Sequence, residues 1–153
     1  MSVIIRPLLP AEAAPLAAWI VIVPLWQRYG VTADATRARL EAAIAADDLV
    51  LAAETEAGVC GFAWVVPTGA FGRSPYLRMI GVHPDRARSG IGARLLDEAE
   101  QRCGADDLFL LVSDFNTEAQ AFYRRHGYTQ IGAIPGFVLP DVTELIFRKR
   151  LRG

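Results

Sequence analysis

Residues 82–96 read VHPDRARSGIGARLL, the end of a strand followed by a loop with two glycines and the start of a helix. The first backbone N–H groups of a helix have no internal acceptor, and the helix dipole adds partial positive charge there. Gly90 and Gly92 leave room for an anionic group beside the backbone. The stretch predicts a site for phosphate or pyrophosphate. The alternative is a turn that needs its glycines only for packing.

Three arginines, Arg86, Arg88 and Arg94, add positive charge around this loop. A dinucleotide-binding loop fits less well, because Leu95 stands where that motif has its third glycine. No Gly-Lys-Ser/Thr sequence exists, which excludes a Walker loop. The loop therefore favours a phosphate-bearing ligand of another class.

Residues 116–128 read NTEAQAFYRRHGY and predict a second helix after a strand. Asn116 and Tyr123 return to within about 20° of each other on that helix, roughly 10 Å apart along its axis. One helical face then offers an amide and a phenol to an extended ligand. The alternative is that Asn116 caps the helix and that Phe122, Tyr123 and Tyr128 are core aromatics.

The remaining hydrophobic patterns predict the other elements of the chain. Strands are expected at 3–5, 49–54, 59–66, 76–82, 108–112, 128–134 and 143–151, helices at 11–28, 35–46, 91–103 and 116–126, and a loop at 67–75. Pro15 and Pro24 predict that the first helix is kinked or split. Gly127 is expected to end the last helix in a left-handed conformation. The order β-α-α-β-β-β-α-β-α-β-β indicates an α/β protein, an α+β arrangement on a mixed sheet.

The two quoted stretches together resemble the GCN5-related N-acetyltransferase (GNAT) superfamily. Arg-Ser-Gly-Ile-Gly-Ala at 88–93 is similar to its pyrophosphate loop, and 116–128 is similar to its Asn-x-x-Ala-x-x-Phe-Tyr-x-x-x-Gly-Phe/Tyr segment. Both stand in the family's order and spacing. The resemblance implies the GNAT acyl-CoA N-acyltransferase fold, with residues 1–153 as a single N-acetyltransferase domain.

The resemblance also implies how acetyl-coenzyme A is bound and which residues act on it. The cofactor-binding residues are Ile80, Gly81 and Val82 for pantetheine, Arg88, Ser89, Gly90, Ile91, Gly92 and Ala93 for the pyrophosphate, and Asn116 for the cofactor arm. The catalytic residues are Tyr123, which protonates the departing thiolate, and Ile80, whose N–H stabilises the developing oxyanion. The amine attacks the bound thioester directly.

The chain departs from the family pattern at two places. Ala87 stands where the family usually has glutamine or arginine, and Arg86 or Arg88 is expected to compensate. The strand at 76–82 lacks the family's catalytic glutamate. Asp114, Glu54 and Glu144 are then candidate bases, with a water relay as an equal alternative.

The resemblance places the acceptor between the N-terminal helices and the later strands. The expected substrate-binding residues are Trp26, Tyr29, Phe71, Arg73 and Tyr76, which would suit an aromatic or apolar amine with a carboxylate at Arg73. The alternative is that these aromatics are core residues and Arg73 is a solvated loop residue. The expected activity is acetylation of a primary amine of a small molecule. A non-catalytic acyl-CoA sensor or assembly module and a protein N-terminal acetyltransferase are the alternatives.

Composition limits the other functions open to the chain of 153 residues. A net charge of −1 gives no basic field for nucleic acid or an anionic membrane surface. The apolar stretch at residues 19–26 contains a proline and is shorter than a membrane span. The cysteines and histidines lack the spacing of metal sites, so no metal is expected. A cytoplasmic protein is expected, and a homodimer is possible by family habit.

Overall fold

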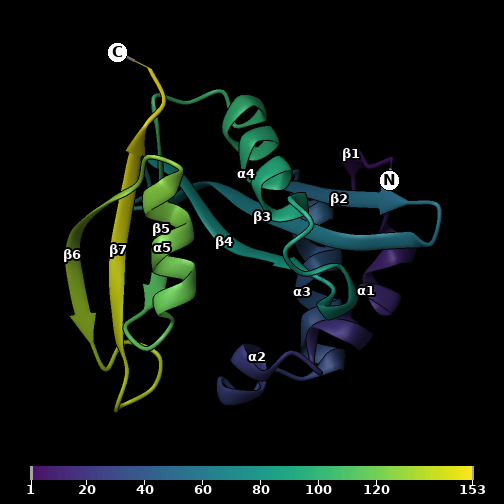
Figure 1. The fold of residues 1–153 in the computed structure, drawn as a ribbon, viewed down its shortest axis with the longest axis horizontal. Helices are drawn as coiled ribbons and strands as arrows, with labels where there is room; N and C mark the ends of the chain where they lie inside the picture. Colours follow the sequence, from purple (N-terminus) through teal and green to yellow (C-terminus); the bar gives the residue numbers. More distant parts are fainter. Residues whose placement is uncertain (1, 153) are drawn as a thin grey trace.

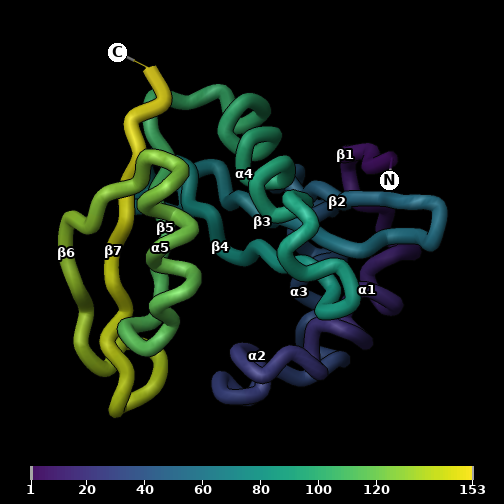
Figure 2. The backbone as a smooth tube through the Cα atoms, in the orientation of Figure 1, coloured from purple at the N-terminus to yellow at the C-terminus, as the bar shows by residue number. Residues whose placement is uncertain are grey.

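The computed structural model describes residues 2–152 (Figures 1 and 2). Its first part contains β1 (Ile4–Pro7), a 3-10 turn (Pro10–Glu12), α1 (Ala13–Ile20), α2 (Pro24–Arg28), α3 (Ala33–Ala45), β2 (Leu49–Thr55), β3 (Gly58–Ala70) and β4 (Ser74–Val82). Its second part contains a 3-10 turn (Pro84–Arg86), α4 (Ile91–Arg102), β5 (Asp107–Ser113), α5 (Thr117–Arg125), β6 (Thr129–Pro135) and β7 (Thr143–Arg150). None of the helices within residues 2–152 is long and apolar enough to cross a bilayer.

The strands form one sheet in the order β1-β2-β3-β4-β5-β7-β6. The pair β4–β5 is parallel, and the other neighbouring strands described are antiparallel. α4 and α5 cover one face of the sheet, while α1 and α3 cover the other (Figure 1). The predicted mixed α/β architecture is confirmed.

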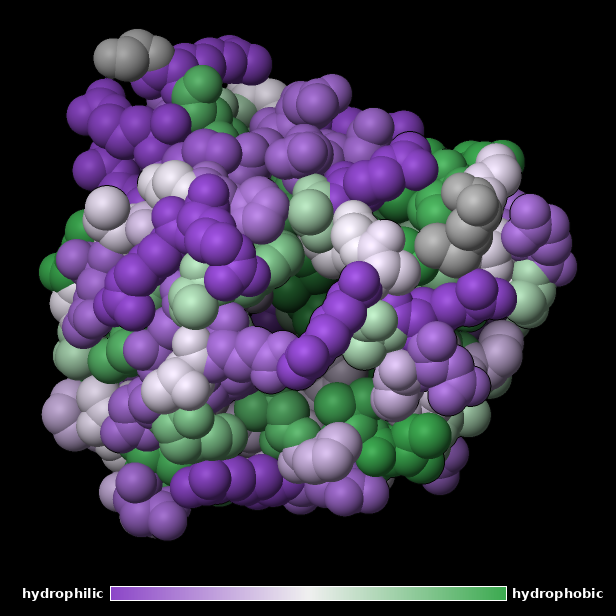
Figure 3. All heavy atoms as spheres, in the orientation of Figure 1, coloured by the Kyte–Doolittle hydropathy of each residue, from purple (hydrophilic) through white to green (hydrophobic). Residues whose placement is uncertain are grey.

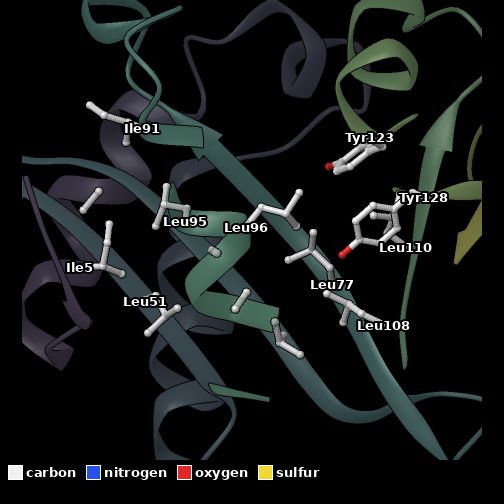
Figure 4. Close-up of a cluster of buried hydrophobic side chains, with 14 of the residues drawn as sticks. Ile5, Leu51, Leu77, Ile91, Leu95, Leu96, Leu108, Leu110, Tyr123 and Tyr128 are labelled. Atoms are coloured by element: carbon white, nitrogen blue, oxygen red, sulfur yellow. The ribbon is translucent and has the colours of Figure 1, made fainter. Parts of the chain in front are cut away.

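Each face of the sheet has its own hydrophobic core. Beneath α4 and α5, Leu95 and Leu96 pack against strand residues such as Leu110, all of them at most 1% exposed (Figure 4). On the opposite face, Leu40 and Phe62 are fully buried under α1 and α3. Each such side chain contributes about 1.5–3 kcal/mol to folding. The sheet is therefore held rigidly from both sides.

The helix predicted over residues 11–28 is split, as the prolines indicate. α1 ends at Ile20, and α2 begins at Pro24, where the missing N–H of proline leaves no helical hydrogen bond unmade. Val23 has the extended backbone that a residue before proline prefers (φ −75°, ψ 127°). Pro15 lies in the first turn of α1 and does not interrupt it. The split gives α2 its separate position below the sheet (Figure 1).

The prediction of a loop over residues 67–75 is wrong for most of these residues. β3 continues to Ala70, and β4 already begins at Ser74. The register between β3 and β4 shifts between Val66 and Ala70. Pro67 lies in this irregular part, where a missing N–H interrupts no regular ladder. Proline and glycine here mark an irregular hairpin end, not the end of the strand.

β4 and β5 are paired only near the start of β4. Tyr76 faces Phe109 and Leu77 faces Leu110, and no further pairing between the two strands is recorded up to Val82. The two strands diverge beyond this point (Figure 1). The last part of β4 therefore has one edge without a neighbouring strand.

A β-bulge lies where the divergence begins. Val65 of β3 pairs with Leu77, but the next residue back, Trp64, pairs with Met79. Arg78 is therefore an extra residue in β4. A bulge bends its strand and increases the local twist. This accounts for the departure of β4 from the direction of β5.

Candidate functional site

Beyond Leu77, the edge of β4 that faces the diverging strand β5 presents backbone groups that are not paired with β5. The N–H of His83 donates to the carbonyl of Cys60 on β3 at 2.7 Å. In an antiparallel ladder, residues whose N–H and C=O groups point to the partner strand alternate with residues whose groups point away. His83 and Gly81 therefore direct these groups to β3. Ile80 and Val82 direct their N–H and C=O groups away from β3, toward the side on which β5 diverges.

The loop between β4 and α4 contains two residues in the left-handed conformation. Arg88 has a φ of +62°, and Gly90, the N-cap of α4, has a φ of +84° with no side-chain cap. Alternation of such residues with ordinary ones turns successive N–H groups toward one point, which suits an anion. A Cβ on Gly90 would meet nothing within 4 Å, and one on Gly92 would meet only ordinary contacts from 3.7 Å outward. The helix start therefore stands before open space.

The other residues predicted for this loop lie at the same helix start. The Ser89 hydroxyl donates to the carbonyl of Arg86 and closes the turn before α4. Ile91 is buried in the core under α4, and Ala93 is partly exposed in the first turn. The loop therefore offers the backbone N–H groups of these residues to a ligand, and not their side chains.

The arginines around the loop have different surroundings. Arg88 is exposed and lies 3.7 Å from Glu118 at the start of α5. Arg94 turns away and donates to the carbonyl of Val3, before β1, at 2.8 Å. Arg88 is therefore placed between the loop and α5, whereas Arg94 is engaged at the sheet edge.

Asn116 lies between β5 and α5 and caps the helix. Its Oδ1 accepts a hydrogen bond from the N–H of Ala119 at 3.1 Å, which confirms the capping interpretation. Its amide NH₂ group bonds to no residue within 2–152 and keeps its donors for a ligand. The buried Gln120 donates to the carbonyls of Ser113 and Asp114, each at 3.0 Å, and fixes this turn. The sequence analysis missed Gln120.

Tyr123 lies at the core surface with its hydroxyl pointing toward β4 (Figure 4). It is 7% exposed, and its ring packs edge-on against Tyr128 and Phe147. Burial, with a smaller contribution from Tyr76, raises the pKa of the phenol well above its usual value. The hydroxyl is therefore protonated at neutral pH, and no residue within 2–152 accepts its hydrogen bond. The surface is hollowed between α4 and α5 (Figure 3).

Trp26 of α2 packs on Gly81 of β4, on the face of the sheet that α1 and α3 cover. A Cβ on Gly81 would overlap the Trp26 ring and lie 3.0 Å from the Phe62 ring. The rings of Trp26 and Phe62 also contact each other, with centroids 5.9 Å apart. Since the backbone of Gly81 faces β3, its contribution here is the missing side chain, and not the pantetheine pairing that the family resemblance implies.

Replacing Gly81 with alanine is expected to lower the free energy of unfolding by about 1–3 kcal/mol, because the new methyl group overpacks the contact with Trp26. Urea denaturation measures this loss. In a Trp26→Leu background the same substitution should cost much less, since the obstructing ring is gone. An equal loss in both backgrounds would show that Trp26 is not the cause.

Two residues predicted for the acceptor lie apart from the others. Phe71 and Arg73 belong to the turn between β3 and β4, and both are exposed. Phe71 is 80% exposed and contacts the edge of the Phe109 ring. This turn lies at the paired end of β4, away from its free edge. Within residues 2–152, neither side chain forms a hydrogen bond, an ion pair or a ring contact with another predicted site residue.

The hydroxyl of Tyr29, just after α2, hydrogen-bonds two buried polar side chains on the neighbouring strands β5 and β7. Its hydroxyl donates to Oε2 of Glu144 and hydrogen-bonds Oγ of Ser113, each at 2.5 Å. Ser113 on β5 and Glu144 on β7 are register partners, and each is 5% exposed. Burial and the bond to Glu144 raise the pKa of Tyr29 to about 12. The sequence analysis did not place Ser113 in the site.

Tyr76 connects this polar group electrostatically with Tyr123. Burial raises the pKa of Tyr76, the charge of Arg78 lowers it and the charge of Glu144 raises it. Tyr76 in turn acts on the pKa of Tyr123. Tyr76 lies where β4 and β5 are still paired, and Ser113, the partner of Tyr29 and Glu144, lies at the end of β5 beyond that pairing.

The other two candidate bases have different places. Glu54 hydrogen-bonds Arg6 at 3.1 Å, on the β1–β2 edge of the sheet. Asp114 is exposed, and its Oδ2 accepts from the N–H of Thr143 at 3.4 Å. Of the three candidates, Glu144 is the buried one, and it accepts the hydrogen bond of Tyr29.

Within residues 2–152, no group of three or more His, Cys, Asp or Glu side chains is arranged to hold a metal ion. Cys60 and Cys103 are free thiols, and burial raises the pKa of both. Raised pKa values disfavour the thiolate that a covalent mechanism needs. Neither cysteine is therefore favoured as a nucleophile.

Comparison with known proteins connects this geometry with a family. A model described as the acetyltransferase (GNAT) domain matches residues 46–130, more than half of the chain and including both the loop before α4 and the helix α5. The mycothiol acetyltransferase of Clavibacter sepedonicus is 36% identical over 84 residues, which are 52% of this chain. The chain matches only 26% of the length of that relative.

Solved structures share the fold over nearly the whole chain. A protein of the GNAT family from Desulfovibrio desulfuricans has a TM-score of 0.80 and 24% identity, with 98% of this chain and 99% of that chain covered. An aminoglycoside 6'-N-acetyltransferase in complex with coenzyme A has a TM-score of 0.81 and 18% identity, with 98% of each chain covered. At these identities the likeness concerns the fold alone.

Proposed function

The chain belongs to the GNAT acetyltransferase family, and from this premise we propose that it transfers the acetyl group of acetyl-coenzyme A to the primary amine of a small molecule. The amine attacks directly while both molecules are bound. The observation that carries the proposal is the free edge of β4, which lies between the start of α4 and the hydroxyl of Tyr123. A cytoplasmic location and a single catalytic domain over residues 1–153 belong to the same proposal.

The residues around the divergence of β4 from β5 offer hydrogen-bonding groups that match those of coenzyme A. The loop from Arg88 to Ala93 offers uncapped N–H groups and open space to the pyrophosphate. Ile80 and Val82 offer N–H and C=O groups to the pantetheine amides, as a sheet edge does to an added strand. The free NH₂ group of Asn116 is a further donor for the cofactor arm. A ligand with two amides and a doubly charged pyrophosphate matches these groups in kind.

Two residues are proposed to act on the reacting atoms. Acetyl-coenzyme A supplies a thioester carbonyl that is activated toward amines. The N–H of Ile80 donates toward the carbonyl oxygen, where negative charge develops. The hydroxyl of Tyr123 keeps its proton at neutral pH and gives it to the departing sulfur.

Calorimetric titration of the protein with acetyl-coenzyme A tests the proposal first. We expect a Kd on the order of 1–100 µM, and binding of acetylpantetheine at least about tenfold weaker because it lacks the pyrophosphate and the adenosine 3'-phosphate joined to it. Thiol release is then measured with a panel of small primary amines. No binding at millimolar acetyl-coenzyme A, or no thiol release with any amine, would contradict the proposed function.

A further inference from the structure

Glu144 is a buried carboxylate without a cationic partner among residues 2–152. It is 5% exposed, and no lysine or arginine within residues 2–152 forms an ion pair with it. The cation of Arg28 lies over the Phe115 ring at 3.7 Å, and that of Arg78 over Trp64 at 5.0 Å. A buried charge is costly unless it is paired. The structure thus provides a site for a positive charge from another molecule.

One oxygen of Glu144 is available for that charge. Oε2 accepts the hydrogen bond of Tyr29, whereas no hydrogen bond of Oε1 is recorded within residues 2–152. No fully enclosed side-chain oxygen or nitrogen among these residues lacks a partner, so Oε1 reaches open space. Leu145 and Phe147 of β7 belong to the core under α4 and α5, so Glu144, which alternates with them, points to the opposite face of the sheet. The free oxygen therefore belongs to the side of the sheet that α2 covers.

Tyr29 is held near Glu144 by contacts outside the core, whereas Trp26 in the preceding helix is the residue that packs against the core. α2 is five residues long and has no buried residue. Beyond it, the Tyr29 ring lies 6.5 Å from the Phe115 ring, which also stacks with Arg28. These contacts lie at the surface, where few atoms must separate for the phenol to shift. Tyr29 is therefore a replaceable hydrogen-bond donor to the carboxylate.

We propose that Glu144 binds the ammonium group of the acceptor amine and receives its proton, and that the Tyr29 hydroxyl holds this carboxylate until the acceptor arrives. The inference rests on the proposed function, because it names the acceptor site of that reaction. Ser113 and the rings of Tyr29 and Tyr76 complete the surroundings of the ammonium group. A primary amine on an apolar or aromatic body fits such a site.

The proton and electron balance is closed without another reactant. The acceptor R–NH₃⁺ gives one proton to Glu144, and the amine lone pair forms the N–C bond as the C–S bond breaks. The sulfur takes the proton of Tyr123, and the second proton lost by nitrogen restores that phenol through water. Glu144 passes its proton to solvent. The products are the amide, coenzyme A thiol and one proton.

Benzylamine and benzyl alcohol are the matched probes, because they share one ring and differ in charge. Each is titrated into the protein saturated with coenzyme A. In Glu144→Gln the affinity for benzylammonium should fall about tenfold or more, because a hydrogen bond to a charged group is lost. Affinity for benzyl alcohol and for coenzyme A should change less than about twofold. In turnover, the KM for benzylamine should rise by the same factor.

Tyr29→Phe tests whether Glu144 binds the ammonium group of the acceptor or only anchors the segment that carries Tyr29. Tyr29→Phe removes the hydrogen bond and keeps the charge of Glu144, whereas Glu144→Gln removes the charge and keeps an oxygen that can accept from Tyr29. Because a competing donor is lost, Tyr29→Phe should bind benzylammonium about threefold more tightly. Equal weakening in both variants, unchanged affinity in Glu144→Gln, or no benzylammonium binding by the wild type would overturn the inference. Thiol release by the wild type with other amines would leave the proposed function intact in each case.

Discussion

Gly90→Asp should weaken acetyl-coenzyme A binding by about 100-fold or more, because it places a carboxylate at the helix start proposed for the pyrophosphate. Gly90 is the N-cap of α4, and a Cβ there points into open space. A carboxylate at this position would itself be stabilised by the helix dipole. The variant should therefore fold and occupy the phosphate site with its own charge. Titration calorimetry measures the change in Kd.

Gly90→Asn is the matched control for this substitution. Asparagine and aspartate have nearly equal size, and both tolerate the φ of +84° better than other residues with a side chain. The asparagine variant lacks the charge, so its affinity should fall by no more than about tenfold. If the two variants bind acetyl-coenzyme A equally well, charge at this helix start does not decide binding, and the pyrophosphate lies elsewhere.

Tyr123→Phe should lower kcat by about 100-fold while the Kd for acetyl-coenzyme A stays nearly constant, because only the proposed proton donor is removed. The ring contacts with Tyr128 and Phe147 are retained by phenylalanine. No hydrogen bond within residues 2–152 is lost, since the hydroxyl has no partner there. Steady-state turnover with a good amine, beside calorimetric Kd values, measures both quantities.

Tyr128→Phe is the matched control among the buried tyrosines. The Tyr128 hydroxyl donates to Glu100 at 2.8 Å, outside the proposed site. Its removal should lower the free energy of unfolding by about 1–2 kcal/mol and leave kcat within about twofold of the wild type. If Tyr123→Phe turns over as fast as the wild type, Tyr123 is not the acid.

The parts of the fold that depend on local chemistry were predictable from the sequence. Asn116 caps α5, and Gly127 follows that helix with a φ of +91°. Pro24 begins α2 and explains why the predicted helix is split. Caps, prolines and glycines act on their immediate neighbours, so their effect can be inferred from a few residues.

The parts that depend on strand register were not predictable. Proline usually ends a strand, so the sequence predicts a loop from Pro67. Pro67 is tolerated within β3 because the pairing of β3 with β4 is irregular there, and this pairing is not visible in the sequence. Ser113 and Glu144 become neighbours only through the pairing of β5 with β7. Tyr29 reaches them across more than 80 residues of sequence. The proposed phosphate loop is local and was found, whereas the acceptor side is assembled from distant segments.

α2 supplies Trp26 and leads directly to Tyr29, yet none of its five residues is buried. Apart from Trp26, which packs on Phe62, substitutions in α2 remove little core surface, so the stability threshold that eliminates most substitutions applies weakly there. β4 tolerates far less, because Gly81 admits no added methyl group against Trp26. Evolution or laboratory selection for new acceptors should therefore accumulate its changes in α2, on an unchanged cofactor-binding strand.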